Sequence, residues 1–186
     1  SKSGVSARMS ITAFENLMSA AERRMLLSGE QNTCIRMSDF LGIISAINGK
    51  VELVYEGEQE GAEQISFHLI NQAVKTLFPS YFPEIKKLEK QDEEGPYDQL
   101  LGWFYGDNEL FLEDSLPDNV YHDTLMGVPN LEKLVATHQA DCLSEDQFFM
   151  MEFLLWGLEA NKKLNKYRTM EGFQFKDGLG NLLAGL

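Results

Sequence analysis

The sequence predicts a mainly helical protein, a helical bundle with minor β structure and an acidic helical C-terminal module. Apolar residues recur at helical spacing in the long segments at residues 10–28, 60–78 and 145–166. Hydrophobic residues make up 44% of the 186 residues and charged residues 24%, which is an ordinary balance for a globular protein with a buried core. These observations favour a folded helical protein over a disordered one.

The first predicted helix, at residues 10–28, has signals at both ends. Thr12 and Glu15 fit a capping box, Ser10 is an alternative N-cap, and Gly29 is placed to end the helix. One face of the helix carries an apolar stripe formed by Ile11, Phe14, Met18, Ala21 and Met25.

Two more helices and a short strand are predicted before residue 79. Residues 38–47 form a helix that Ser38 or Asp39 caps, and residues 51–55 alternate like a short strand. The helix at residues 60–78 follows an acidic loop. Its apolar stripe consists of Ile65, Leu69, Ala73 and Leu77, broadened by Ile70 and Val74.

Pro79 and Pro83 mark a break in helical structure. Helical character resumes at residues 84–90, and the polar residues 91–95 are predicted to be a linker or an exposed loop. Residues 101–113 hold two aromatic and apolar runs separated by a turn, which predicts short strands or a hairpin.

The C-terminal third is predicted to contain the most buried helix. Pro117 and Pro129 are placed like the first residues of short helices. Residues 145–166 are apolar nearly all round and are predicted to be the central helix of their module. Cations gather near its predicted C-terminal end, where the helix dipole favours them: Lys162, Lys163, Lys166 and Arg168. The tail is predicted to form a strand at residues 173–175 and then a short apolar helix.

The charge of the chain excludes two classes of partner. Sixteen Lys and Arg against 29 Asp and Glu give a net charge of −13, which repels phosphate backbones and anionic membrane surfaces. The imbalance is greatest between residues 91 and 160, which contain sixteen Asp and Glu and, among Lys and Arg, only Lys133. No apolar run reaches the roughly 20 residues that span a bilayer. We therefore expect no nucleic-acid partner and no membrane partner.

The N-terminus and the cysteines predict a cytoplasmic location. Residues 1–4 lack the apolar region of a secretory signal. Cys34 and Cys142 are too few for a disulfide framework. The chain begins without Met, so we expect it to be a fragment of a longer protein.

Motifs that bind nucleotides or activate nucleophiles are missing from the sequence. Gly49-Lys50 is followed by Val51, where a P-loop requires Ser or Thr, and neither G-x-G-x-x-G nor G-x-S-x-G occurs. His138 and Cys142 stand four residues apart but supply only two ligands, which do not close a zinc site. We expect no metal, no cofactor and no catalytic residue in this chain. An enzyme with an unrecognised acid–base or metal site is one alternative.

Three short motifs lie close together near the N-terminus. They are Gly4-Val5-Ser6-Ala7-Arg8, which fits G-x-S-x-R, then Ala20-Ala21-Glu22-Arg23-Arg24, and then Ile35-Arg36-Met37-Ser38-Asp39-Phe40, which fits Val/Ile-x-x-x-Asp-Val/Phe. This arrangement resembles the lid subdomain of AAA+ ATPases in the MoxR and magnesium chelatase branch. With the run at residues 49–61, it looks like the C-terminal half of bacterial ATPases similar to the magnesium chelatase I subunit.

The resemblance implies a nucleotide-sensing role for the first motif. Arg8 matches the sensor-2 arginine, which contacts the nucleotide phosphates, and Gly4 and Ser6 complete its motif. A guanidinium is always charged and binds phosphate oxygens bidentately, which suits that role. The resemblance also implies that residues 1–78 are a lid-like helical subdomain, followed by an acidic helical accessory module at residues 79–186.

In this family the P-loop, the Walker B acids and the arginine finger lie upstream of the lid. The chain alone is therefore expected not to be catalytic, while its parent protein would hydrolyse ATP with magnesium. The expected partners are the upstream AAA+ core, neighbouring subunits and an unknown protein client. The lid would couple the nucleotide state to assembly and partner binding.

An alternative hypothesis predicts the same fold but no nucleotide binding. In that alternative the chain is a free-standing acidic helical adaptor that binds proteins and does not bind ATP. The aromatic run at residues 103–105 and the pair Met150 and Met151 are expected to lie in the core, with a partner-binding groove as the other interpretation.

Overall fold

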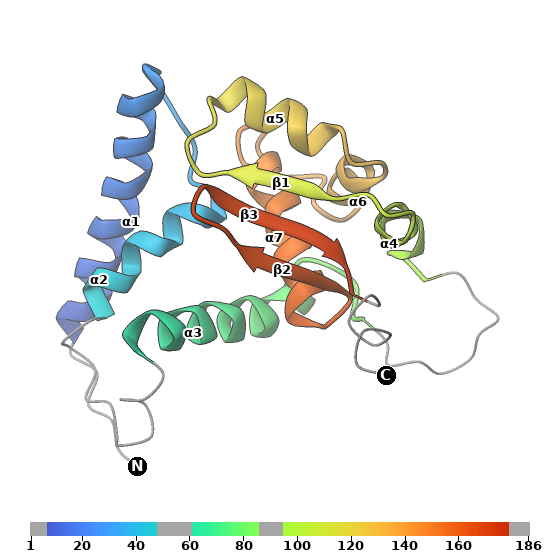
Figure 1. Cartoon of the computed structure of the whole chain (residues 1–186), viewed down its shortest axis with the longest axis horizontal. Helices are drawn as coiled ribbons and strands as arrows, with labels where there is room; N and C mark the ends of the chain where they lie inside the picture. The colour runs from blue at the N-terminus through green and yellow to red at the C-terminus, as the bar shows by residue number, and fades with distance from the viewer. Residues whose placement is uncertain (1–6, 48–60, 86–94, 179–186) are drawn as a thin grey trace, which may run out of the picture.

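The computed structural model describes residues 7–47, 61–85 and 95–178, which fold into helices around one small sheet (Figure 1). This confirms the predicted fold class, mainly helical with minor β structure. Within the described residues the elements are α1 (Ala7–Ser28), the 3-10 helix η1 (Met37–Ile43), α2 (Ile44–Ile47), α3 (Gly61–Leu77), the 3-10 helix η2 (Phe78–Ser80), α4 (Asp98–Tyr105), β1 (Leu110–Glu113), α5 (Asp118–Met126), α6 (Leu131–His138), α7 (Gln147–Ala160), β2 (Leu164–Arg168) and β3 (Gly172–Asp177).

Helix α7 is the centre of the molecule, as the sequence predicts. Every residue from Met150 to Leu158 is buried. The helix contacts α3, α5, α6, η1 and β2, and in Figure 1 it lies behind the sheet. Because α7 is covered on all sides, its apolar character all round is what its position requires.

The sheet is antiparallel with strand order β1-β3-β2. Leu110 of β1 pairs with Phe175 of β3, and Lys166 of β2 pairs with the same Phe175 on the other side. One face of the sheet is apolar and packs on α7, where the rings of Phe173 and Trp156 meet edge to face at 5.0 Å. Lys166 also points to this side, with its Nζ 3.3 Å from the Trp156 ring centroid.

The predicted N-terminal helix is confirmed, although it begins three residues earlier, at Ala7. The predicted N-caps are therefore wrong. Ser10 and Thr12 lie inside the helix, and the Thr12 hydroxyl donates to the carbonyl oxygen of Arg8. Gly29 adopts a φ of 73°, a left-handed conformation that favours glycine and ends the helix as predicted.

The predicted helix at residues 38–47 begins as 3-10 turns and becomes α-helical only in α2. Its N-cap is Arg36, not Ser38 or Asp39. Asp39 nevertheless serves the cap, because its carboxylate accepts the backbone N–H of Arg36 at 2.8 Å.

Helix α3 is confirmed, and Ile70 and Val74 of its predicted apolar face are buried, together with Ser66. Leu69 and Leu77 of the same predicted face are 45% and 49% exposed. The core therefore uses only one side of the predicted apolar face.

The aromatic run before β1 is a helix, α4, so only the second half of the predicted hairpin at residues 101–113 is a strand. The predicted helix at residues 145–166 ends earlier, at Ala160, and Lys162 turns the chain with a φ of 61°. Of the four cations predicted at the end of this helix, Lys166 and Arg168 therefore lie in β2. The predicted strand at residues 51–55, most of the helix at residues 84–90, the loop at residues 91–94 and the last helix lie outside the described residues.

One hydrophobic core runs through both halves of the chain. It includes Met37, Ile70 and Val74 together with residues of α4 to α7 and the sheet. The ring of Phe78, at the end of the first half, is tilted against that of Phe153 of α7, with the ring centroids 6.3 Å apart. Residues before and after position 78 therefore share their apolar packing.

Candidate functional site

The structure places the predicted nucleotide-sensing residue at the outer end of a long helix. Arg8 lies in the first turn of α1 and is exposed. Gly4 and Ser6, the other two predicted site residues, lie outside the described residues. In Figure 1 the N-terminal end of α1 points away from α7 and the sheet.

The N-terminal half of α1 carries an apolar stripe that the fold leaves uncovered. Ile11 and Phe14 are 62% and 64% exposed, and Met18, one turn further along, is also exposed. The stripe continues into the fold only at Ala21, which is buried. Large apolar side chains gathered on one exposed face are typical of an interaction surface.

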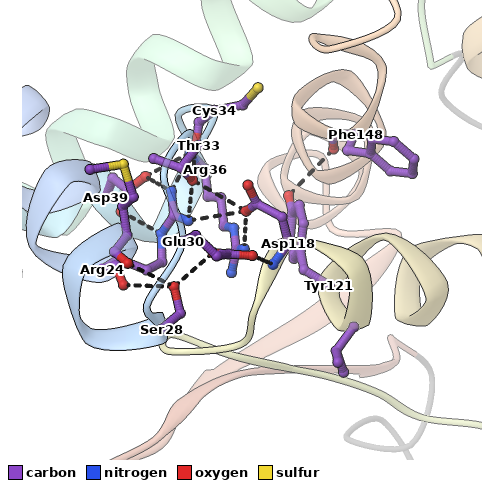
Figure 2. A network of polar contacts seen from close by, with 12 residues as sticks. Arg24, Ser28, Glu30, Thr33, Cys34, Arg36, Asp39, Asp118, Tyr121 and Phe148 are labelled. Atoms are coloured by element: carbon purple, nitrogen blue, oxygen red, sulfur yellow. Dashed lines mark hydrogen bonds and ion pairs between the residues drawn. The ribbon is translucent and has the colours of Figure 1, made fainter.

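Near the other end of α1, Arg24 is buried and uses all of its N–H groups (Figure 2). Its Nε and Nη2 donate to the two carboxylate oxygens of Asp39, at 3.2 and 2.8 Å. Nη2 also donates to the carbonyl oxygen of Cys34, and Nη1 donates to Thr33 Oγ1 and Asp118 Oδ1. These contacts match the five N–H donors of a guanidinium.

Asp118, the first residue of α5, extends these contacts to the accessory half of the chain. Its Oδ1 also accepts hydrogen bonds from Arg36 Nη2 and Thr33 Oγ1. Its backbone N–H donates to Glu30 Oε1 at 2.7 Å, while Ser28 Oγ donates to Glu30 Oε2 at the same distance. The end of α1 is therefore joined to α5 by side chains and by backbone.

Tyr121 and Glu152 carry the contacts into the core. The Tyr121 hydroxyl and the backbone N–H of Met37 both donate to Glu152 Oε2, at 2.8 and 3.0 Å. The guanidinium of Arg36 lies over the Tyr121 ring, with Cζ 4.1 Å from the centroid. Among the described residues, Arg36 Nε and Nη1 have no hydrogen-bond partner.

We call this set the Arg24 network and define it as Arg24, Glu30, Thr33, Arg36, Asp39, Asp118, Tyr121 and Glu152. Burial lowers the pKa of Arg24, but the hydrogen bond and charge of Asp39 outweigh burial and raise the pKa overall. Burial raises the pKa of Glu152, against the hydrogen bonds from Tyr121 and Met37.

The Arg24 network is suited to holding elements in place. Its arginine and aspartate side chains are directed at one another, which leaves the buried Arg24 without a spare donor for a ligand. Bidentate Arg–carboxylate pairs also fix direction as well as distance. The network therefore orients α1 relative to η1, α5 and α7. Because Arg8 lies on α1, the network also sets the position of Arg8.

Sequence reasoning placed Arg24 and Asp39 in motifs but missed their partners Asp118, Tyr121 and Glu152. A signal for Glu152 is present, because it is the one charged residue in the apolar run at residues 147–158. A carboxylate that is buried in such a run needs hydrogen-bond or charged partners. Asp118 has no comparable local signal.

The other candidate ligands and nucleophiles form no centre in the described part of the chain. There, no group of three or more His, Cys, Asp and Glu side chains is arranged to hold a metal ion. Cys34 and Cys142 are free and partly buried, and burial raises the pKa of both thiols. A raised pKa disfavours the reactive thiolate.

Comparison of the chain with protein-family models, with curated proteins and with solved structures found no match. None of the described helices combines the length and the apolar character that crossing a lipid bilayer requires.

Proposed function

We propose that this chain is the C-terminal lid and accessory region of an AAA+ ATPase similar to the MoxR and magnesium chelatase branch. The observation that carries the proposal is the bidentate pair between Arg24 and Asp39. Arg24 ends the second motif of the resemblance, and Asp39 belongs to the third. Their buried contact supports the interpretation of α1 and η1 as one lid unit.

In this proposal Arg8 senses the nucleotide, with Gly4 and Ser6 completing its motif. The upstream core of the parent protein, in the cytoplasm, would bind ATP and magnesium, and the chain itself would contribute no catalytic residue. The exposed stripe of Ile11, Phe14 and Met18 would pack against that core or a neighbouring subunit.

The length of α1 would allow it to couple the nucleotide site to the accessory module. Sixteen residues separate Arg8 from Arg24, which corresponds to about 24 Å along a helix. A helix of this length moves as a rigid body, so a change at the phosphates would displace its far end. The Arg24 network would pass that displacement to α5 and α7, and hence to the accessory module.

The test is ATP hydrolysis by the full-length gene product that contains this chain. Arg8→Ala is expected to lower kcat roughly 10- to 100-fold, because a hydrogen bond to a charged group contributes about 1.5–3 kcal/mol. Arg8→Lys should recover only part of the rate, since an ammonium lacks the bidentate geometry. Lys133→Ala, which removes an exposed cation from α6, is the matched control and should leave the rate unchanged.

Wild-type turnover and assembly in Arg8→Ala would remove Arg8 from the site. If the full-length gene product neither binds nor hydrolyses ATP, the lid proposal fails as a whole. The chain would then be the alternative, an acidic helical adaptor that binds proteins without a nucleotide.

A further inference from the structure

An apolar groove runs between α3, η1 and α7, away from Arg8 and Arg24. It has a volume of about 360 Å³. Its floor is made by core residues of α3 and α7, including Val74, Met150 and Phe153. The floor of the groove is therefore part of the hydrophobic core.

The rim of the groove is apolar and exposed. It is formed by Leu69 and Leu77, which belong to the part of the predicted apolar face of α3 that the core does not use, and by Tyr81, which is 42% exposed. Eight residues separate Leu69 from Leu77, which corresponds to about 12 Å, or two helical turns. An uncovered apolar stripe of this length, above a preformed floor, is typical of a site for another apolar surface.

An acidic hollow adjoins one end of the groove. Tyr81, Phe149 and Met150 line both the groove and this second hollow, which has a volume of about 510 Å³. Asp141 and Asp146 line this second hollow, and both are exposed. Among the described residues, those that line the two hollows include no Lys or Arg.

We propose that this groove binds an amphipathic helix of a partner protein, with apolar side chains along α3 and Lys or Arg side chains at the Asp141 and Asp146 end. A helix fits because the described walls of the groove are helical, so no strand edge is offered for β-pairing. A basic partner fits because Asp141 and Asp146 line the hollow that adjoins this end of the groove, and no Lys or Arg of the described residues lines it. The inference does not depend on the proposed ATPase role, since neither Arg8 nor Arg24 lines the groove.

The test uses a labelled synthetic helix of roughly three turns, with leucines at i, i+3, i+4 and i+7 and lysines at one end. Fluorescence anisotropy with the purified chain should show saturable binding. A matched peptide with glutamates in place of the lysines should bind at least about tenfold more weakly, because the acidic end repels it. Equal binding of the two peptides, or saturable binding of neither, would overturn the proposal.

Variants locate the binding. Leu69→Asn with Leu77→Asn should abolish binding of the lysine peptide while the circular dichroism spectrum stays unchanged, since both side chains are exposed. Leu26→Asn, which changes an exposed leucine of α1, is the control and should bind normally. Asp141→Asn with Asp146→Asn should reduce the preference for the lysine peptide over the glutamate peptide.

A photo-cross-linker on the lysine peptide tests the location without any variant. It should attach to residues that line the groove or the adjoining acidic hollow, and attachment elsewhere would overturn the assignment. Sedimentation velocity tests whether a second copy of the chain occupies the groove instead. If the wild-type chain forms a dimer that the Leu69 and Leu77 variant dissociates, the groove belongs to a second copy of the chain and the proposal is wrong.

Discussion

Every residue of α7 from Met150 to Leu158 is buried, whereas α1, with 22 residues against 14, buries only Ala21 and Arg24 among its described side chains. Apolar contacts hold α7 on all sides. By contrast, α1 is anchored near one end by a buried guanidinium and its carboxylate partners. The two helices thus depend on different forces.

The difference has consequences for how each helix responds to change. Burial of a large apolar side chain contributes roughly 1.5–3 kcal/mol, and α7 has many such side chains, so its position is redundantly determined. The position of α1 depends on its contacts with η1 and α2 and on a few charged groups with strict geometry, because only two of its described side chains are buried. A buried ion pair is costly to break, because the remaining partner is left charged in the interior. We therefore expect the loss of one side chain of the ion pair to displace α1 more than the loss of one apolar side chain displaces α7.

Removing the carboxylate that faces Arg24 should have the largest effect. Asp39→Asn is expected to lower the free energy of unfolding by about 3–5 kcal/mol, because it leaves Arg24 charged and incompletely paired. Chemical denaturation measures the loss. Hydrogen exchange should show that amides of α1 lose protection while those of α7 keep it.

The control for this prediction is Asp114→Asn, since Asp114 also forms a bidentate pair with an arginine, Arg168, but at a site where both side chains are 32% exposed. Exposed pairs contribute only about 0.2–1 kcal/mol. Equal losses in the two variants would contradict the role assigned to the Arg24 network.

The packing of α7 is tested at Gly157, where a methyl group has no room. A Cβ at this position would lie 2.0 Å from Cδ2 of the Phe78 ring. Gly157→Ala is therefore expected to cost about 1–3 kcal/mol, the usual range for overpacking, despite the better helix propensity of alanine. Thermal unfolding measures the change.

Phe78→Leu in the same chain should recover part of the loss, because it shortens the side chain that the added methyl group would meet. Gly102→Ala on α4 is the matched control, since a Cβ there would have nothing within 4 Å. A Gly157→Ala protein as stable as the wild type would show that Phe78 moves aside freely.

The smallest effect is expected at Glu152, where α7 meets the Arg24 network. Because burial raises the pKa of this carboxyl, the folded protein keeps its proton at pH values where the unfolded chain, with a pKa near 4.5, has lost it. The contribution of Glu152 to stability is thus largest below pH 4.5 and falls as the pH rises through the folded pKa. Glu152→Gln keeps an oxygen for Tyr121 and Met37 and has no such pH dependence.

The measurement is the difference in free energy of unfolding between Glu152→Gln and the wild type from pH 4 to pH 8. It should shift steadily in favour of the variant as the pH rises. Parallel profiles for the two proteins would mean that Glu152 has the same pKa in the folded and unfolded states, which contradicts the prediction.

Much of the fold could be predicted from local patterns. The helices α1, α3 and α7 and the strand β3 follow from hydrophobic periodicity and end signals, and Gly29 ends α1 as predicted. Errors arose where a local pattern had two outcomes. The aromatic run of α4 suits a strand or a helix, and the lysines after Ala160 suit a helix end as well as β2.

For the site, the predicted residues were Gly4, Ser6 and Arg8, while Arg24 and Asp39 stood in two short motifs without a predicted contact between them. Periodicity and motif spacing act between near neighbours in the chain. They were not sufficient to bring Asp118 to Arg24, 94 residues away, since nothing local to α5 specifies that contact. Nor could they decide which face of α3 is buried, because both of its apolar stripes satisfy the same period. Those outcomes depend on how helices pack around α7, and packing is a property of the whole core.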